Sequence, residues 1–457
     1  MIAIVESRAD SASEHICTLL RELVDWERRR DDTRPASDGG GTWYRTEGAE
    51  LRSFDEIHLE LERPAEAFDC EPELLVFASR HSGETGPLLT GHFTGNFGPA
   101  EYGGEDGTLA RTCPNALARL LEAFDEYAPA GYDVGMECTH HGPTDVGVPS
   151  LFAELGSDQT QWDDPAGAEA VARAILDLRG VSPHREPFAD STAPTCRDDE
   201  SIPRRQVVGF GGGHYVPRFE RIVRETSWAV GHVAAEWALE AMGDPDESRD
   251  ILEAAFERSR TDLAVVEGGR PVLEDVLEEL GYRVVGETWL REVGDRSRSL
   301  VETVEGELGT VSDGVRFGRE RTTPAAVVSL PDELVDAAEG IDPDRAWSAV
   351  ADRTVAFETE NGGSRVGGRA AVADADAREE VVEALADVLE DGYDAVSITD
   401  EAVVVRETAF DPALAREAGV PEGPKFGRLA DGESVIVDGG EIDPEAVHVE
   451  RTIRFPI

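Results

Sequence analysis

Short, continuous apolar runs alternate with segments of helical periodicity over the first 290 residues, and this alternation strongly constrains the fold. Strands that are apolar throughout are typical of parallel sheets connected by helices. We therefore expect an α/β fold: a three-layer α/β/α core with a mixed, mostly parallel sheet. Strands are predicted at 2–5, 54–61, 74–78, 132–138, 206–210 and 263–266. Helices are predicted from Ser13, as the capping residue, and at 115–127, 166–178, 218–225, 229–242, 248–258 and 271–280.

The length of 457 residues suggests about three domains. We expect the core over residues 1–292, with a charged, glycine-rich surface insertion at 28–50 and an exposed loop at 181–205. Over residues 293–406 the sequence predicts an appended α+β domain, in which we find no site motif. The remaining segment, 407–457, contains GVPEGPKFGRL, which predicts a fixed loop, and we expect this segment to pack on the core.

Acidic residues outnumber basic ones by 95 to 43, which gives a formal net charge of −52. Lys425 is the only lysine, so 42 of the basic residues are arginine. A chain that is 40% hydrophobic still folds, and such evenly spread acidity is typical of proteins from extreme halophiles. In molar salt the counterion release that drives nucleic-acid binding is largely lost, so the charge excludes few partners.

The amino terminus lacks a basic region followed by a long apolar one, and no run approaches eighteen apolar residues. We therefore expect a soluble, cytoplasmic protein with no membrane partner. Five cysteines without a CxxC pair indicate a reducing compartment rather than a disulfide framework.

Histidines are concentrated in one part of the chain. Seven of the ten lie between positions 81 and 232, and none lies between 233 and 447. Four segments carry the chemistry: 78–98, 136–157, 208–219 and the pair Gly231-His232, which is predicted to lie on a helix. Each segment is expected at the end of a strand, where doubly wound sheets bind ligands.

The pair His140-His141 follows an apolar strand and comes three residues after Glu137. Imidazoles in such a loop can bind zinc, accept a proton from water or orient one another. Because adjacent side chains on an extended segment point apart, we expect only one of the two to face a substrate. His81 and His92 could add a proton carrier and Asn96 an amide donor.

The motif GFGGGHY predicts a strand, a glycine loop and a helix that begins near Pro217. Its backbone N–H groups could face a phosphate or an oxyanion, although a tight turn around a core histidine explains the pattern equally well. The residues of this candidate subsite are Gly211, Gly212, Gly213, His214, Tyr215 and Arg218. Phosphate contacts could come from Arg218, Arg221 and Arg224, and base stacking from Phe210, Tyr215 or Phe97.

Together, ASRHSGETGPLLTGHFTGNFG, MECTHHGPT, FAELGS, GFGGGHYVPRF and the Gly231-His232 pair resemble, in this order, the archaeal and plant type of D-aminoacyl-tRNA deacylase. The resemblance implies hydrolysis of the ester between a D-amino acid and the 3′-terminal ribose of tRNA. It also implies a core related to the phosphorylase and peptidyl-tRNA hydrolase type of fold, a monomer, and a need for zinc. DNA is not an expected partner. One or two zinc ions would draw on scattered residues: His81, Glu137, His140, His141 and His214.

Other functions stay open on the residues alone. A metal-dependent peptidase or amidohydrolase would cleave amides, and a nucleoside-phosphorylase relative would need inorganic phosphate. A non-catalytic tRNA-end binding protein would retain charged tRNA without releasing its amino acid.

Overall fold

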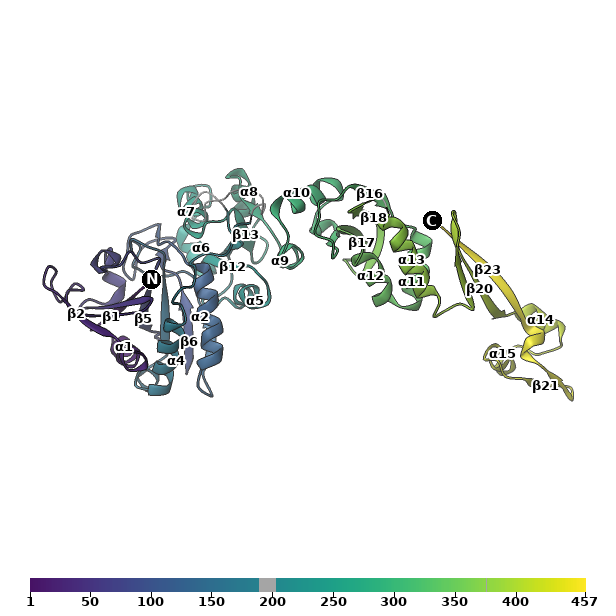
Figure 1. Cartoon of the computed structure of the whole chain (residues 1–457), viewed down its shortest axis with the longest axis horizontal. Helices are drawn as coiled ribbons and strands as arrows, with labels where there is room; N and C mark the ends of the chain where they lie inside the picture. The colour runs from purple at the N-terminus through teal and green to yellow at the C-terminus, as the bar shows by residue number, and fades with distance from the viewer. Residues whose placement is uncertain (189–202, 375) are drawn as a thin grey trace. The chain divides into compact units, whose positions relative to one another are not determined.

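The computed structural model describes residues 1–188, 203–374 and 376–457. These residues form two compact units, Met1–Ser297 and Arg298–Ile457. In Figure 1 the first unit runs from purple to teal and the second from green to yellow. The predicted end of the core at 292 lies five residues before this division. Most of the predicted loop at 181–205 falls on 189–202, outside the described residues.

A mixed eight-stranded sheet forms the centre of the first unit, in the order β2-β3-β4-β1-β5-β10-β6-β9. Strands β4, β1, β5 and β10 are parallel, whereas β6 runs antiparallel to β10. The strands are β1 (Ile2–Ser7), β2 (Glu27–Asp31), β3 (Gly41–Thr46), β4 (Ala49–Phe54), β5 (Leu74–Arg80), β6 (Leu88–His92), β9 (Asp133–Met136) and β10 (Ser150–Gly156).

Helices α1 (Ser11–Leu23), α4 (Pro165–Leu176) and α2 (Pro114–Tyr127) pack side by side on one face of this sheet (Figure 1). Asp10, not Ser13, caps α1, because its carboxylate accepts the N–H groups of Ala12 and Ser13. The opposite face, with Phe77 and Phe152, packs on loops and 3-10 turns where the sequence predicts a second helical layer.

A second, separate sheet, with β11 joined to parallel neighbours, completes the unit in the order β12-β11-β13-β14. Its strands are β11 (Gln206–Phe210), β12 (Ala229–Ala234), β13 (Leu263–Val266) and β14 (Arg283–Val284), and its helices include α5 (Pro217–Glu225), α6 (Glu236–Met242), α7 (Arg249–Ser259) and α8 (Pro271–Glu279). The predicted α/β class is therefore confirmed, but the described residues of this unit form these two sheets and a short two-stranded one, β7 (Gly95–Asn96) with β8 (Thr108–Leu109). The more specific fold relationship stays a prediction.

Three sequence predictions fail locally. Residues 28–50 are not a surface insertion, because they supply β2 and β3 and the start of β4 at the edge of the main sheet. Residues 55–61 leave the sheet after Phe54 and form a 3-10 turn. Residues 229–242 begin with the buried strand β12, so the Gly231-His232 pair lies on a strand and not on a helix.

The second unit contains an antiparallel sheet, β15-β17-β18-β16, whose core also includes residues of three helices. The elements are β15 (Arg316–Phe317), β16 (Ala326–Ser329), β17 (Ala356–Glu360), β18 (Arg365–Val372), α11 (Asp332–Ile341), α12 (Pro343–Ala351) and α13 (Ala377–Leu389). This mixture of strands and helices agrees with the α+β expectation for residues 293–406.

A further sheet, β19-β20-β23, joins this region to the predicted 407–457 segment. Strand β20 (Ala402–Phe410) crosses the predicted boundary at 406 and pairs with β23 (His448–Pro456), while β19 covers Ala395–Ile398. The boundary is therefore wrong. Part of GVPEGPKFGRL forms helix α15 (Pro424–Ala430) rather than a loop, and the Lys425 ammonium donates to the Ile436 carbonyl at 2.6 Å. The contact of this segment with the core stays a prediction.

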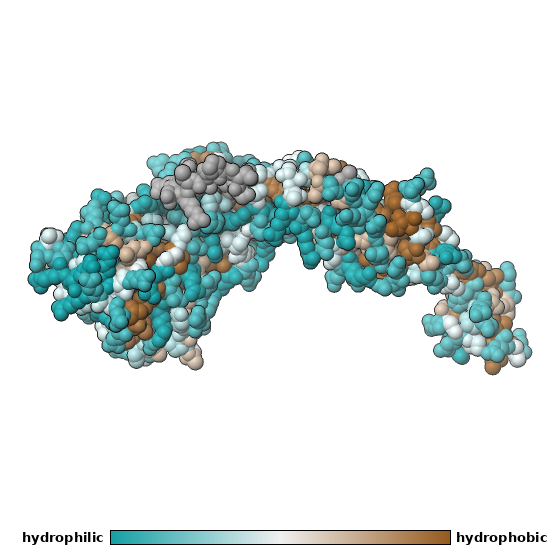
Figure 2. Space-filling view, viewed as in Figure 1, coloured by the Kyte–Doolittle hydropathy of each residue, from teal (hydrophilic) through white to brown (hydrophobic). Residues whose placement is uncertain are grey.

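The surface visible in Figure 2 is mostly hydrophilic, as the acidic composition requires. None of the helices in the described ranges is long and apolar enough to cross a membrane. The four cysteines that these ranges contain, Cys17, Cys70, Cys113 and Cys138, are free thiols.

Candidate active site

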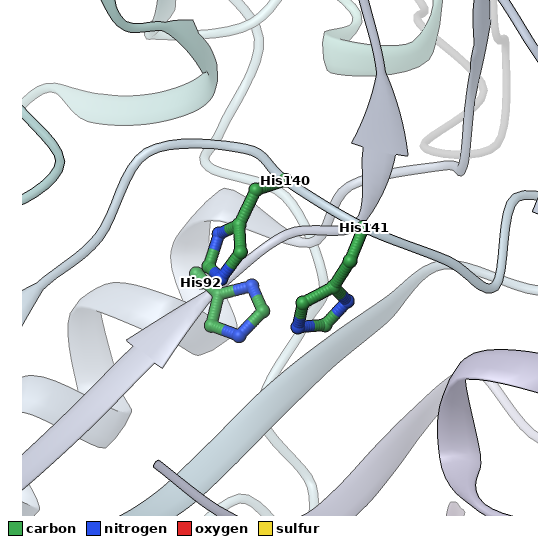
Figure 3. Close-up of side chains that lie close together, drawn as sticks. All are labelled: His92, His140 and His141. Carbon is green, nitrogen blue, oxygen red and sulfur yellow. The ribbon is translucent and has the colours of Figure 1, made fainter. Parts of the chain in front are cut away.

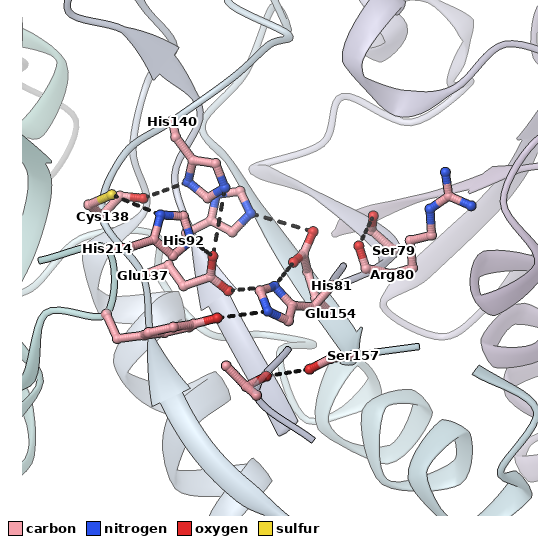
Figure 4. A network of polar contacts seen from close by, with 12 residues as sticks. Ser79, Arg80, His81, His92, Glu137, Cys138, His140, Glu154, Ser157 and His214 are labelled. Carbon is pink, nitrogen blue, oxygen red and sulfur yellow. Dashed lines mark hydrogen bonds and ion pairs between the residues drawn. The ribbon is translucent and has the colours of Figure 1, made fainter. Parts of the chain in front are cut away.

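Five separate segments bring histidines and carboxylates together around one pocket of about 360 Å³. His81 follows β5, His92 ends β6, and Glu154 lies within β10. Residues 137–141 follow β9, and His214 follows β11, so both sheets contribute (Figure 4). The pocket is lined by Asp10, Ile57, His58, Leu59, Ser79, Arg80, His81, Ser82, Tyr102, Glu137, His140, His141, Phe152, Glu154 and His214.

Glu137 is the centre of the polar network. Its fully buried carboxylate lies 2.7 Å from Nε2 of His214, 3.2 Å from Nδ1 of His81 and 3.7 Å from Nε2 of His140. Burial raises the pKa of Glu137, but the hydrogen bonds with His214 and His81 outweigh it and hold the pKa well below its ordinary value. The carboxylate is therefore a permanent negative charge inside the pocket.

A second buried carboxylate, Glu154, lies 3.5 Å from Nδ1 of His81 and 3.5 Å from Nε2 of His92. Burial lowers the pKa of His81, but Glu137 and Glu154 together raise it to about 10. His81 is therefore an imidazolium at neutral pH, and its Nε2 lies 2.9 Å from the Tyr215 hydroxyl.

His140 and His141 have the opposite charge state. Burial, followed by the repulsion of His92, lowers the pKa of His140 to about 4. Burial and its histidine neighbours hold the pKa of His141 well below its ordinary value. Both imidazoles are neutral at pH 7, so they can accept a proton or bind a cation.

The rings of His92, His140 and His141 face one another (Figure 3), with centroids 4.2 to 4.9 Å apart. The expectation that only one of the adjacent pair faces the site is wrong. His141 has a left-handed backbone, with φ at +46°, so the pair is not extended and both side chains line the pocket.

These three histidines present a donor set that suits zinc. Each Nδ1 lies within hydrogen-bond distance of a backbone carbonyl, of Phe93, Cys138 and Gly142 respectively. When an imidazole is neutral and its Nδ1–H donates there, Nε2 keeps its lone pair, as in histidines that bind zinc. Burial lowers the pKa of His92, but Glu154 raises it above its ordinary value, so a metal ion would have to displace a proton from His92. One ligand atom from each lies within 4.8 Å of the others, and the buried Nε2 of His92 has no hydrogen-bond partner. The carboxylate of Glu154, 3.5 Å from Nε2 of His92, favours a positive charge at that nitrogen.

Two further groups in the described ranges bring potential ligand atoms within 4.8 Å: Cys138 with His140 and His214, and His81 with Glu137 and Glu154. Burial and the charge of Glu137 raise the pKa of Cys138 to about 12, so its thiol stays protonated. The predicted ligands His81, Glu137, His140, His141 and His214 therefore lie close together, and His92, which was not among them, belongs to the three-histidine group.

Several predicted residues lie elsewhere or have other partners. Asn96 donates to the carbonyls of Gly103 and Glu105. In the glycine loop, the Gly211 N–H donates to Ala234, and the Gly212 carbonyl accepts from Glu236. Gly211, Gly212 and Gly213 are not pocket-lining residues, which favours the tight-turn interpretation, while His214 joins the network and Tyr215 contacts it.

Two other predicted residues are also engaged. The Arg218 guanidinium donates to the Val266 carbonyl at 3.0 Å and lies 4.0 Å from Glu287. His232 is fully buried on β12, between the Thr139 hydroxyl and the Ala110 carbonyl.

The sequence prediction omits Glu154 from the catalytic set. The available signal was a single carboxylate in the otherwise apolar run SLFAELG, which forms a strand buried along its whole length. A charged side chain in such a strand needs a partner, and here the partners are His81 and His92.

Comparison with known proteins identifies the family of this chain. A family model described as D-aminoacyl-tRNA deacylase matches residues 68–285, the range that holds the histidines and carboxylates around the pocket. A D-aminoacyl-tRNA deacylase from Halorubrum lacusprofundi is 57% identical and covers 100% of this chain and 97% of its own. One from Natronomonas pharaonis is 52% identical and covers all of both chains.

A crystal structure of a conserved protein of unknown function matches 64% of this chain and 96% of its own, with a TM-score of 0.53 and 26% identity. The family model and the full-length relatives thus carry the same family name. The chain belongs to the D-aminoacyl-tRNA deacylase family.

Proposed function

We propose that this protein hydrolyses the ester bond between a D-amino acid and the 3′-terminal ribose of tRNA and releases both products. The observation that carries the proposal is the buried set of neutral and charged histidines held by Glu137 and Glu154, inside the region that matches the family model. The aminoacyl ester is an activated substrate, so an oriented water and stabilisation of one oxyanion suffice.

The chain's own groups meet these two needs. Where its Nε2 does not bind a metal ion, neutral His140 or His141 accepts the proton of the attacking water. Cationic His81, held by Glu137 and Glu154, offers positive charge within the same pocket for the developing oxyanion. Cys138 is not the nucleophile, because its buried thiol is protonated.

His92, His140 and His141 would hold zinc in this proposal. Because Nε2 of His140 can bind only one ion, the group of Cys138, His140 and His214 is an alternative site and not a simultaneous second one. Bound zinc would supply a Lewis acid that polarises the ester carbonyl or acidifies water. We further propose that the enzyme acts as a monomer in the cytoplasm and has neither DNA nor a membrane as a partner.

The decisive assay incubates the full chain in concentrated KCl with D-tyrosyl-tRNA and L-tyrosyl-tRNA, with and without a chelator. We expect release of D-tyrosine, with slower release of L-tyrosine, and loss of activity in chelator that added Zn²⁺ restores. Retention of charged tRNA without release would favour a binding protein instead. Cleavage of peptide amides, or a requirement for phosphate, would favour the other two alternatives.

Variants in the same assay test the histidine roles. His140→Ala and His141→Ala should each lower kcat by about 100-fold or more, because proton transfer or metal binding is lost. His448→Ala, in the second unit, is the matched control and should leave kcat unchanged. Near-normal kcat in both pocket variants would show that the pair has no catalytic role.

A further inference from the structure

Exposed aromatic side chains of the first unit gather at the pocket. Within its described residues, four large hydrophobic side chains are exposed: Tyr102 (68%), Trp237 (47%), Tyr215 (36%) and Val272 (57%). Val272 lies on α8, but the other three are aromatic and each contacts the catalytic region.

Each aromatic residue is fixed to the site by its own contact. Tyr102 lines the pocket, and its carbonyl accepts the N–H of Gly142, next to His141. The Tyr215 hydroxyl lies 2.9 Å from His81.

Trp237 lies in the first turn of α6, and its side chain lies near the Cys138 thiol, whose pKa it lowers against the larger effect of burial. That sulfur lies 3.8 Å from Nδ1 of His214. The preceding residue, Glu236, donates its N–H to the Gly212 carbonyl and so joins α6 to the glycine loop.

The charges around the site leave little electrostatic attraction for an RNA backbone. Arg221 forms a bidentate pair with Glu287, and Arg224 pairs with Glu220 and Asp125. Arg80 is the one arginine among the described residues that line the pocket. Affinity for an RNA end must therefore come mainly from contacts other than phosphate pairing.

The other aromatic residues suggested by the sequence cannot supply those contacts. Phe97 and Phe210 are buried in the core around the second sheet, so no base can stack on them. Base stacking requires an accessible ring face, and it is insensitive to salt compared with phosphate contacts. Tyr102, Tyr215 and Trp237 meet that requirement.

We propose that Tyr102 and Trp237, together with Tyr215, form a stacking platform for the unpaired 3′-terminal bases of the tRNA. The inference rests on the proposed function and names the residues that hold its substrate. The platform positions the terminal ribose so that its ester reaches His81, His140 and His141. Tyr215 also belongs to the catalytic network, so Tyr102 and Trp237 provide the cleaner test.

The experiment measures steady-state deacylation of D-tyrosyl-tRNA in 3 M KCl. Tyr102→Ala and Trp237→Ala should each raise KM about ten-fold, since one stacked base is lost, while kcat stays within about three-fold. Tyr102→Phe and Trp237→Phe keep an aromatic face and should restore most of the affinity. Val272→Ala, which removes an exposed apolar side chain on α8, should leave KM unchanged.

A binding measurement separates this inference from the proposed function. Fluorescently labelled uncharged tRNA, titrated with each protein, should show the same ten-fold weakening in the two alanine variants. Removal of the three 3′-terminal nucleotides from the tRNA should abolish the difference between wild type and variants. A wild type that binds tRNA this way but does not deacylate would overturn only the proposed function. Unchanged KM and unchanged binding in both alanine variants, or a fall in kcat alone, would overturn the platform.

Discussion

Neighbouring histidines in this pocket hold opposite charge states because of their carboxylate partners. Glu137 and Glu154 both reach His81, and they raise its pKa to about 10 against the effect of burial. His140, buried beside other histidines, has a pKa lowered to about 4. The sequence revealed His140, His141 and Glu137 because adjacent polar residues after a strand are conspicuous. It could not reveal that Glu154 pairs with His81, since the two are brought together only by the β5–β10 register.

Glu154→Gln tests that pairing at the residue scale. The substitution keeps the shape but removes the negative charge that holds His81 and His92, so kcat should fall by about 10- to 100-fold. Steady-state deacylation and the pH profile of kcat are the measurements. Glu122→Gln, at an exposed ion pair with Arg119, is the matched control. A variant with wild-type kcat and pH profile would show that Glu154 is only structural.

The buried His232 should make the folding stability of the protein depend on pH. Burial lowers its pKa to about 4, whereas in the unfolded chain it is near 6.5. Between these values the unfolded chain binds a proton that the folded chain does not, so stability falls as pH drops from 6.5 to 4. The contribution of this residue is about 3 kcal/mol, fully present above pH 6.5.

The test is urea unfolding of wild type and His232→Gln at pH 7, 5.5 and 4 in constant KCl. Glutamine removes the titration while keeping a polar side chain near Ala110. The wild type should lose up to about 3 kcal/mol more than the variant across this window. Parallel losses in the two proteins would contradict the assignment.

At the scale of elements, the sequence predicts best where periodicity and capping agree. The predicted strand at β11 and the predicted helix at α5 match the structure closely, and each has an apolar core face or a proline at its start. The helix predicted over residues 229–242 is wrong at its start. Alanine-rich sequence favours a helix, whereas Val230 and Val233 are buried in a parallel ladder with β11. Tertiary pairing overrides local propensity there.

The sequence also fails to predict the β2–β3 hairpin, because the residue that anchors the hairpin is distant in sequence. Arg52, fully buried on β4, pairs with Asp31 at 2.9 Å, Glu50 at 2.9 Å and Asp69 at 2.8 Å, and lies over the Trp43 ring. Charged, glycine-rich sequence predicts a solvated loop, since nothing local shows that one arginine satisfies three carboxylates.

Arg52→Met should therefore destabilise the protein strongly. It leaves two or three carboxylates without their buried cation, at a cost of about 3 to 5 kcal/mol in unfolding free energy. Arg30→Met, at an exposed pair with Asp32 on the same hairpin, should cost less than about 1 kcal/mol. Urea unfolding in 3 M KCl measures both. Equal small effects would mean that the buried cluster does not anchor the hairpin.

At the scale of the whole molecule, every residue that lines the pocket lies in Met1–Ser297. The sequence predicted this separation from the distribution of histidine. It placed the inner boundary of the second region at 406, however, because no local signal shows that residues 402–410 pair with 448–456. Hydrophobic periodicity is a local signal and does not indicate which distant segments of the chain pair as strands.

A chain ending at Ser297 should retain the hydrolytic step. We expect kcat for D-tyrosyl-tRNA within about three-fold of the full chain, because no catalytic side chain is removed. Circular dichroism and a thermal transition in 3 M KCl check that the shortened protein is folded. A folded product that binds charged tRNA without hydrolysing it would show that Arg298–Ile457 takes part in the chemistry.

The pairing of β20 with β23 also governs the order in which this protein can form during its synthesis. All strands of the first unit have been synthesised before residue 298 is made, so the pocket can assemble while the ribosome is still translating the second unit. Strand β20 must wait for residues 448–456 before it acquires its second neighbour. At about 5 to 20 residues per second, the first unit has roughly 8 to 30 seconds in which to fold before that partner strand exists.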